Sequence, residues 1–344
     1  MVQPTNGQLI HDKLSATLCD SFGRVIRDVR MSVTDRCNFR CVYCMPPTGL
    51  SWVEKPELLT FEELHRLAEI FVELGVTRIR LTGGEPLLRQ GLPVLVSQLA
   101  HIPGISDLAL TTNGFLLGDS LPELIAAGLN RVTMSLDSLN PTTFWTMTRK
   151  AALSKVLENI RRVQQSSLSP LKINCVVMRG VNDHEILDFV NFARETRVAV
   201  RFIEYMPLNG PDQWRPEVMV SGDEILERIQ HQFQLIPVAP VSPSETALRF
   251  RFADGGAGEI GIIASVTRPF CNACSRIRLT ADGKLKTCLF AHQEYDLRGR
   301  LRAGASRSVL KDLICNAVFH KGSGHTINSP EFLAPARTMS CIGG

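Results

Sequence analysis

A β-rich run leads directly into three cysteines in the stretch Val29-Arg-Met-Ser-Val-Thr-Asp-Arg-Cys37-Asn-Phe-Arg-Cys41-Val-Tyr-Cys44. The cysteines have the spacing C-x₃-C-x₂-C, which places three thiolates on one tight loop. Such a loop can hold three irons of a [4Fe–4S] cube and leave the fourth iron open to another ligand. A structural zinc site normally needs four ligands, and no histidine or fourth cysteine lies nearby. The stretch therefore predicts a strand that ends in an iron–sulfur loop.

Short apolar runs alternate with amphipathic helical patterns over the first 210 residues. Strands are expected at 29–33, 78–81, 107–111, 131–136, 172–178 and 200–205. Helices are expected near 61–74, 92–101, 120–127, 154–166 and 184–195. Capping boxes are expected at Thr60–Glu63 and Asn182–Glu185. Near-continuous apolar strands indicate a parallel sheet covered on both faces. The repeated strand–helix units indicate an α/β fold, an incomplete (β/α)6 TIM-like barrel.

This rhythm ends after Pro207. Residues 208–216 are rich in Gly, Pro and Asn, and residues 237–244 form another proline-rich connector. The final third is expected to combine short strands, a second set of cysteines and one helix near 306–320. We therefore predict a partial barrel over residues 1–210 and a smaller module over residues 211–344 that covers the barrel's open side.

A second set of three cysteines lies in the final third of the chain, at Cys271, Cys274 and Cys288. Its spacing, C-x₂-C-x₁₃-C, again suits a cluster with an open iron. Alternatively, His292 would complete a Cys₃His zinc site, and the spacing alone leaves both alternatives open. Arg276 and Arg278 alternate along a strand and so point to the same side. Beside a metal they would act as anion receptors, which favours the cluster.

Composition and charge indicate a globular chain without membrane, export or nucleic-acid features. The sequence is 44% hydrophobic and 21% charged, which is ordinary for globular domains, and no apolar run approaches the ~18 residues that span a membrane. The N-terminus lacks the apolar region of a secretory signal. A net charge of +4 fits an anionic small substrate but not a nucleic-acid coat. Ten cysteines are therefore expected to be cytoplasmic thiols or metal ligands.

The first cysteine motif resembles the signature of the radical S-adenosylmethionine superfamily, and Thr82-Gly-Gly-Glu-Pro86 resembles that superfamily's second hallmark. Glycines at this place let the backbone approach a ligand closely. The resemblance implies that the first cluster carries S-adenosylmethionine on its open iron. It also implies a set of residues that contact this cofactor: Tyr43, Gly83, Gly84, Glu85, Ser135 and Met206.

Nearly the whole chain resembles the GTP 3′,8-cyclases, the family that begins molybdenum cofactor biosynthesis. The resemblance rests on residues 30–37, 111–114, 202–207 and 271–278, and on Gly343-Gly344. One departure is Gly322 after Lys321, where a proline is expected, and it bears on local backbone geometry only.

Two [4Fe–4S] clusters follow from this resemblance, each held by three cysteines, with the guanine of GTP on the open iron of the second. The residues implied in GTP binding are Arg30, Arg80, Thr111, Lys172, Arg201, Arg276, Ile277 and Arg278. The residues implied in catalysis are Arg276, Arg278, Gly343 and Gly344. The two glycines would reach into the active site, where a side chain would not fit.

The implied activity is that of a lyase. A 5′-deoxyadenosyl radical removes hydrogen from C3′ of GTP, and the C3′ radical adds to C8 of guanine. The product is (8S)-3′,8-cyclo-7,8-dihydroguanosine 5′-triphosphate. Implied partners are an electron donor, a downstream cyclic pyranopterin monophosphate synthase and a second copy in a homodimer, with neither nucleic acid nor membrane.

Two alternatives remain open at this point. A peptide-maturing radical enzyme with an auxiliary cluster would typically carry more cysteines in its last third than the three found here. A zinc- or iron–sulfur-bearing regulator that binds nucleic acid would need a basic stripe with stacking aromatics.

Overall fold

A twelve-stranded sheet organises the described part of the chain. The computed structural model describes residues 17–45, 50–168, 170–208, 214–335 and 337–343. The first six strands are β1 (Asp28–Ser32), β2 (Arg78–Thr82), β3 (Asp107–Thr112), β4 (Arg131–Ser135), β5 (Lys172–Val177) and β6 (Ala199–Glu204). The later strands are β7 (Leu235–Val238), β8 (Leu248–Phe252), β9 (Glu259–Ile263), β10 (Arg276–Leu279), β11 (Lys284–Lys286) and β12 (Tyr295–Asp296).

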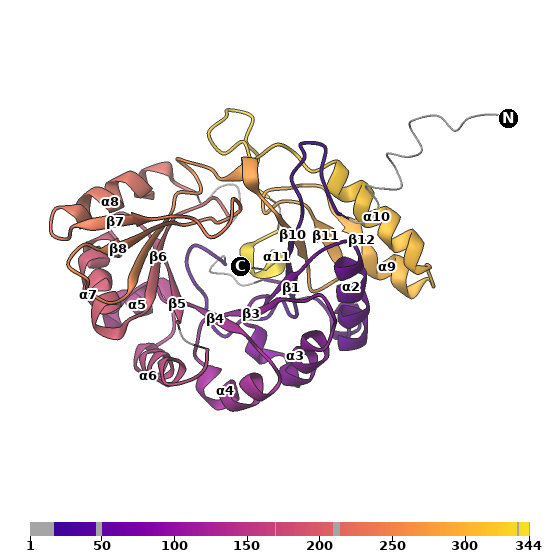
Figure 1. Cartoon of the computed structure of the whole chain (residues 1–344), viewed down its shortest axis with the longest axis horizontal. Coiled ribbons are helices and arrows are strands. Elements are labelled where there is room, and N and C mark those ends of the chain that lie inside the picture. The colour runs from indigo at the N-terminus through magenta and orange to yellow at the C-terminus, as the bar shows by residue number, and fades with distance from the viewer. Residues whose placement is uncertain (1–16, 46–49, 169, 209–213, 336, 344) are drawn as a thin grey trace.

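The strands follow the order β12-β11-β10-β1-β2-β3-β4-β5-β6-β9-β8-β7. From β10 through β1–β6 to β9 all neighbours are parallel, and the outer pairs are antiparallel. Figure 1 shows these strands curving into an open arc with helices on its convex side. Because β12 and β7 end the sheet without pairing to each other, the barrel is incomplete, as the sequence predicted.

Helices cover the outer face of this arc (Figure 1). Those of the first half are α2 (Phe61–Glu73), α3 (Leu92–Ala100), α4 (Leu117–Ala126), α5 (Pro141–Thr148), α6 (Leu153–Gln164) and α7 (Ile186–Thr196). Each buries one apolar stripe, such as Leu64, Leu67 and Phe71 on α2, against the sheet's hydrophobic core. No helix in the described ranges is long and apolar enough to cross a membrane.

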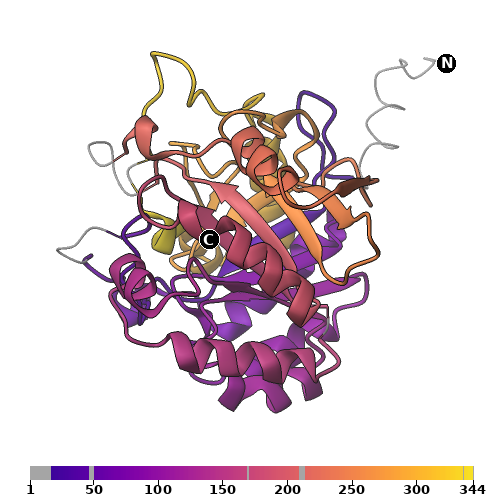
Figure 2. The same cartoon turned by 90° about the vertical axis from the view of Figure 1, so that its left-hand side faces the viewer.

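Residues beyond 210 supply both outer parts of the sheet, with β9 beside β6 and β10 beside β1. Figure 2 shows the orange strands of this part next to the pink strand of β6. Its helices are α8 (Gly222–Gln230), α9 (Leu297–Arg302), α10 (Arg307–Phe319) and α11 (Met339–Ile342). The division into domains at residue 210 stays a prediction.

The start of one helix was predicted correctly from the sequence, whereas another helix was not predicted. The capping box at Thr60 is confirmed: its hydroxyl accepts from the Glu63 N–H at 3.2 Å, and the Glu63 carboxylate accepts from the Thr60 N–H at 2.8 Å. Helix α5 was not predicted, although Asn140 before Pro141 is a start signal. The Asn140 side chain accepts from the first amides of α5.

The capping box predicted at Asn182–Glu185 is wrong. The Asn182 amide donates to the carbonyls of Asp137 at 2.7 Å and Val176 at 2.8 Å. The buried Glu185 carboxylate accepts from the Leu139 N–H at 2.6 Å. These side chains satisfy backbone groups brought by tertiary folding, because buried polar groups must find partners. They thereby tie the loop after β4 to β5.

Replacing Thr60 with alanine removes one half of the α2 capping box. We expect the free energy of unfolding of Thr60→Ala to be about 1 kcal/mol lower than that of the parent, which is the usual cost of losing such a cap. Chemical denaturation followed by circular dichroism measures this. The matched control is Thr142→Ala, an exposed threonine in the first turn of α5, which should change stability by no more than about 0.5 kcal/mol. Equal stability of the two variants would contradict the prediction.

Candidate functional site

One cavity of about 310 Å³ gathers both cysteine sets. Its lining includes all six predicted ligands: Cys37, Cys41, Cys44, Cys271, Cys274 and Cys288. We call it the cysteine cavity. Cys271 and Cys274 precede β10, whereas other lining residues lie at or just beyond the carboxyl ends of parallel strands: Gly83 after β2, Ser135 in β4 and Met206 after β6. This is the end of a parallel barrel at which active sites form.

The first cysteine loop is fixed by backbone hydrogen bonds to the end of α5. The Arg40 N–H donates to the Thr148 carbonyl at 3.0 Å, and the Val42 N–H to the Met147 carbonyl at 2.9 Å. Burial raises the pKa of Cys37 to about 11 and that of Cys44 to about 12. Thiols in such surroundings favour the neutral form. The donor set therefore fits a group that brings its own positive charge, as iron does.

The cysteine arrangement does not suit a single metal ion. Among the described residues, no group of three His, Cys, Asp or Glu side chains could hold one ion. His292, the fourth ligand of the zinc alternative, is exposed, and its Nε2 lies 3.1 Å from the carbonyl oxygen of Leu333. The Cys₃His zinc set is thus not assembled. The thiols of a cubic cluster ligate different irons, so their spacing is wider.

At the second cysteine set, cations lie close to the thiols. Burial opposes ionisation of Cys274, but Lys321 and Arg276 lower its pKa to about 7. Lys321 is only 3% exposed, and its ammonium donates to the carbonyls of Arg276 and Thr287. This positive surrounding favours the thiolate of Cys274, the form that binds iron.

The glycine pair after β2 packs against the segment that precedes Cys37. A side chain at Gly83 would overlap the Thr34 carbonyl, and one at Gly84 would overlap the Arg36 carbonyl. The Gly84 N–H donates to the Thr34 carbonyl at 2.9 Å. Glycine here therefore sets the distance between the first cysteine loop and β2.

Glu85 is fully buried and is not among the residues that line the cysteine cavity. Its carboxylate accepts from the N–H groups of Leu87 at 3.0 Å and Asn113 at 2.8 Å, and from the Thr112 hydroxyl at 2.8 Å. Burial raises the pKa of Glu85 to about 7. In this structure Glu85 joins the ends of β2 and β3, and its predicted contact with the cofactor is untested.

Tyr43, Ser135 and Met206 all line the cysteine cavity, together with Asp137, which sequence reasoning missed. The Tyr43 hydroxyl donates to the Asp137 carboxylate at 2.6 Å. Burial raises the pKa of Asp137 to about 6. The available signal was position, since Asp137 follows Ser135 directly after β4.

Arginines on three adjacent strands form one row across the sheet. In the strand register Arg278 pairs with Arg30, and Arg30 pairs with Arg80. Burial, together with the charges of nearby arginines, lowers the pKa of Arg80 to about 9 and that of Arg278 to about 10. The Arg80 guanidinium donates to the Thr111 hydroxyl at 3.2 Å. The row is a concentration of buried positive charge that a polyanion would relieve.

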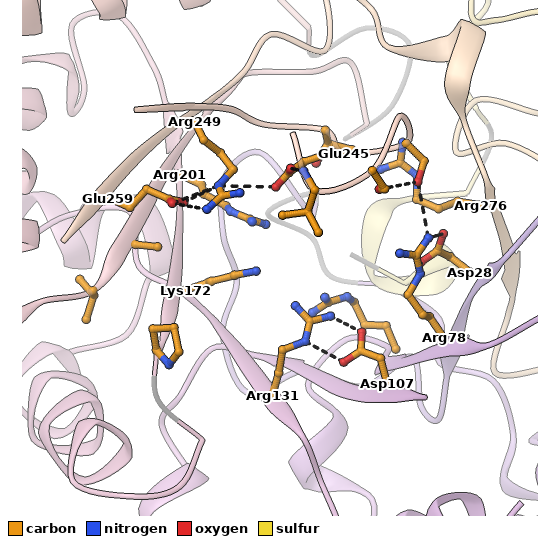
Figure 3. A pocket seen from close by; sticks show the side chains of 18 of the residues that line it. Asp28, Arg78, Asp107, Arg131, Lys172, Arg201, Glu245, Arg249, Glu259 and Arg276 are labelled. Carbon is orange, nitrogen blue, oxygen red and sulfur yellow. Dashed lines mark hydrogen bonds and ion pairs between the residues drawn. The ribbon is translucent and has the colours of Figure 1, made fainter. Parts of the chain in front are cut away.

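Two members of the row, Arg30 and Arg80, also border a second cavity, of about 660 Å³, at the opposite ends of the strands. We call it the basic cavity (Figure 3). Arg30, Arg80, Arg201 and Arg276 line both cavities. Arg201 has a buried Nε without a partner among the described residues, so this donor is available to a ligand.

The predicted GTP contacts do not all reach the same cavity. Lys172 lines the basic cavity only, and burial lowers its pKa to about 8. Thr111 and Arg278 line the cysteine cavity only. Ile277 lines neither and is fully buried in the hydrophobic core, because it alternates with its two arginine neighbours along β10.

Besides Arg197, sequence reasoning missed three arginines of the basic cavity that are held in ion pairs. Figure 3 shows their ion pairs, which are Arg78–Asp28, Arg131–Asp107 and Arg249–Glu259. Each acidic partner lies on a neighbouring strand. A lone arginine in a strand sequence does not reveal such pairing.

Helix α11 lies inside the arc of strands (Figure 1). Arg278 donates to the carbonyl of Gly343, the residue after α11. Gly343 has a φ of 80°, and a side chain there would overlap Ser32 and Thr82. Arg337, just before α11, pairs with Asp282 at 2.9 Å. Residues 337–343 are called the α11 segment below, and the predicted catalytic residue Gly344 lies outside the described residues.

Comparisons with known proteins agree with this geometry. Residues 31–193 match the family described as the Radical SAM superfamily, and residues 198–327 match Molybdenum Cofactor Synthesis C. A GTP 3′,8-cyclase of Streptomyces coelicolor is 44% identical, covering 95% of this chain and 96% of the relative. The chain belongs to the GTP 3′,8-cyclase family. Another member, from Thermodesulfovibrio yellowstonii, is 43% identical, and the match covers 94% of this chain and 99% of the relative.

A solved structure outside this family supports the fold. SuiB of Streptococcus suis has a TM-score of 0.60 and 13% identity, covering 98% of this chain and 83% of SuiB. At that identity the likeness shows the fold alone. It agrees with the incomplete barrel described above.

The close packing of Gly343 yields a prediction. In Gly343→Ala the new methyl group would meet Ser32 and Thr82, and the positive φ would be strained. We expect the α11 segment to leave its place while the barrel stays folded. Limited proteolysis should then cleave the variant near the segment, whereas cleavage elsewhere and the circular dichroism spectrum should match the parent. A control, Gly180→Ala, has a similar φ of 72° but open space around it. Equal protection of the segment in both variants would refute the prediction.

Proposed function

We propose that this chain is a radical S-adenosylmethionine GTP 3′,8-cyclase. It converts GTP into (8S)-3′,8-cyclo-7,8-dihydroguanosine 5′-triphosphate, the first step of molybdenum cofactor biosynthesis. Membership of the family supports the activity. One observation carries it on the structural side: a single cavity is lined by both cysteine sets and by the arginine row.

Cys37, Cys41 and Cys44 are proposed to hold the first [4Fe–4S] cluster. When bound, this cluster and S-adenosylmethionine supply the 5′-deoxyadenosyl radical that removes hydrogen from C3′ of GTP. The chain's part is to place the reactants and exclude competing reactions. Tyr43, held by Asp137, and the Gly83–Gly84 backbone would position the cofactor, with Ser135 and Met206 as further contacts.

Cys271, Cys274 and Cys288 are proposed to hold a second [4Fe–4S] cluster, with guanine on its open iron. Support comes from the shared cavity and from the cations beside Cys274. The triphosphate would then extend along the arginine row toward Lys172 and the basic cavity. Charged donors on neighbouring strands suit several phosphates at once.

The α11 segment is proposed to complete the site once the substrates are bound. Its contact with Arg278 supports this role, since Arg278 lines the cavity as well. The electron donor, the downstream cyclic pyranopterin monophosphate synthase, the homodimer, the cytoplasmic location and the division at residue 210 belong to the proposal as sequence predictions.

Single cysteine substitutions should separate the two clusters. We expect Cys41→Ala to form no 5′-deoxyadenosine, because the first set loses a ligand. We expect Cys274→Ala to keep forming 5′-deoxyadenosine while it binds GTP weakly and makes no cyclised product. Anaerobic assays with GTP, S-adenosylmethionine and dithionite measure both products, and equilibrium dialysis measures GTP binding.

Metal analysis and a control complete this experiment. The parent should contain about eight irons and each variant about four, as two [4Fe–4S] clusters require. Cys315→Ala removes an exposed cysteine and should match the parent. If Cys274→Ala binds GTP as tightly as the parent, the second set is not the guanine site.

Removing Arg278 should weaken nucleotide binding without loss of iron. A charged hydrogen bond contributes about 1.5–3 kcal/mol, so Arg278→Ala should lower GTP affinity roughly tenfold or more. Arg278→Lys should recover only part of it, because lysine lacks the planar fork. The control is Arg300→Ala, an exposed arginine on α9. Parental affinity and turnover in Arg278→Ala would exclude the role.

A further inference from the structure

A buried ion pair lies next to the backbone of the second cysteine set, in a segment that has no role in the proposed reaction. Arg24 and Asp20 precede β1 and are joined through Nε and Oδ2 at 2.6 Å. Their side chains are 6% and 0% exposed. A buried charged pair is costly to desolvate unless its remaining groups are satisfied. The partners of Arg24 therefore indicate what the pair does.

The guanidinium of Arg24 joins two distant segments by their backbone. Nη1 donates to the Cys271 carbonyl at 2.8 Å and to the Ser323 carbonyl at 2.6 Å. Nη2 donates to the Gly322 carbonyl at 2.6 Å. One planar fork thus holds the backbone of a proposed cluster ligand against the loop of residues 322–324. A lysine could not span these three carbonyls in fixed directions.

Asp20 fixes the direction of that fork. Its Oδ2 accepts from Arg24 Nε, and its Oδ1 accepts from the backbone N–H groups of Phe22 at 3.0 Å and Arg24 at 2.9 Å. A β-bridge between Cys19 and Val25 closes the same turn. The turn therefore presents Arg24 in one orientation.

The loop held by Arg24 lies directly against the thiols. A side chain at Gly324 would come within 3.0 Å of the Cys271 Cβ and 3.3 Å of its sulfur. Lys321, at the start of the loop, donates to the carbonyl of Thr287, the residue before Cys288. Lys321 and the loop thus contact both segments that carry the second cysteine set. Its Gly-Ser-Gly sequence has high conformational freedom, so side chains from elsewhere must fix it.

We propose that Arg24, oriented by Asp20, is a positioning residue that sets the geometry of the second cysteine set. It touches no substrate and acts through the Cys271 backbone and the 322–324 loop. The inference rests on the proposed second cluster. Groups that orient metal ligands from outside commonly change metal affinity by about 10–100-fold when replaced. Arg24 thereby controls how firmly the cluster is held and how its open iron meets the nucleotide.

The test isolates the second site. In a full-length background with Cys37, Cys41 and Cys44 all replaced by alanine, bound iron reports only the second set. We expect this protein to hold about four irons after anaerobic reconstitution. Adding Arg24→Lys should release iron to a chelator about tenfold faster. It should also remove the change that GTP causes in the electron paramagnetic resonance spectrum of the reduced cluster.

Arg27→Lys is the matched control. The Arg27 side chain also donates to a backbone carbonyl, that of Gly75 at 2.7 Å. Its backbone N–H donates to the Ser275 carbonyl beside Cys274, and Arg27→Lys keeps this backbone bond. Iron release and the GTP-dependent spectrum should match the background protein. Equal thermal stability of the Arg24 and Arg27 variants would show that the Arg24 effect is local.

The outcomes separate the inference from the function on which it rests. A background protein that binds no iron overturns the second cluster and this inference together. A background protein with four irons whose Arg24→Lys form keeps the same release rate and spectrum overturns the inference alone. If Arg24→Lys does not fold, Asp20→Asn decides, because it leaves the guanidinium but weakens its orientation. Unchanged iron release in Asp20→Asn then refutes the role.

Discussion

Buried positive charge on adjacent strands is the constraint on which the site depends. Arg278, Arg30 and Arg80 are direct neighbours in the strand register. Burial lowers the pKa of all three, and for Arg30 the charges of Arg278 and Arg276 add to it. Holding such charges together costs folding free energy unless an anion offsets it. A polyanionic ligand should therefore stabilise the fold itself, since it binds only the state in which the row is assembled.

Parallel pairing explains how this row meets the cysteines. β10 comes from the last third of the chain, yet it pairs with β1 and extends the sheet on that side. Parallel strands end at the same edge, so the cysteine loop after β1 and the glycine pair after β2 lie together there. Arg30 and Arg80 lie within these two strands, two residues before each strand ends. In the register of β1 and β10, the arginines lie between Cys274, which precedes β10, and Cys37, which follows β1. Cations between two thiol sets suit a nucleotide that extends from one set toward the other.

Local patterns predicted the elements, whereas long-range partners stayed hidden. The positions of β1–β6 were predicted to within one residue because apolar runs are local, whereas β7–β12 were not placed. Cysteine spacing identified both thiol sets. The chain separates Arg24 from Cys271 by 247 residues, so no window of sequence contains both. The capping box at Asn182 was wrongly predicted for the same reason. The Asn182 side-chain amide donates to backbone carbonyls that only the folded chain brings near. Helix α5 was predictable from Asn140-Pro141 but was overlooked.

The α11 segment links the two thiol sets through a single arginine. The Ser340 backbone hydrogen-bonds to Cys44 of the first set, and the Gly343 carbonyl accepts from Arg278 beside the second. Arginine carries five donors, so Arg278 can hold the segment and still direct donors into the cavity. A nucleotide that engages those donors fixes the guanidinium and, with it, the place of Gly343. Nucleotide binding at the arginine row and the place of the α11 segment would then be coupled through one side chain. A lysine at this position has three donors on one nitrogen and lacks the planar fork that directs them to two partners.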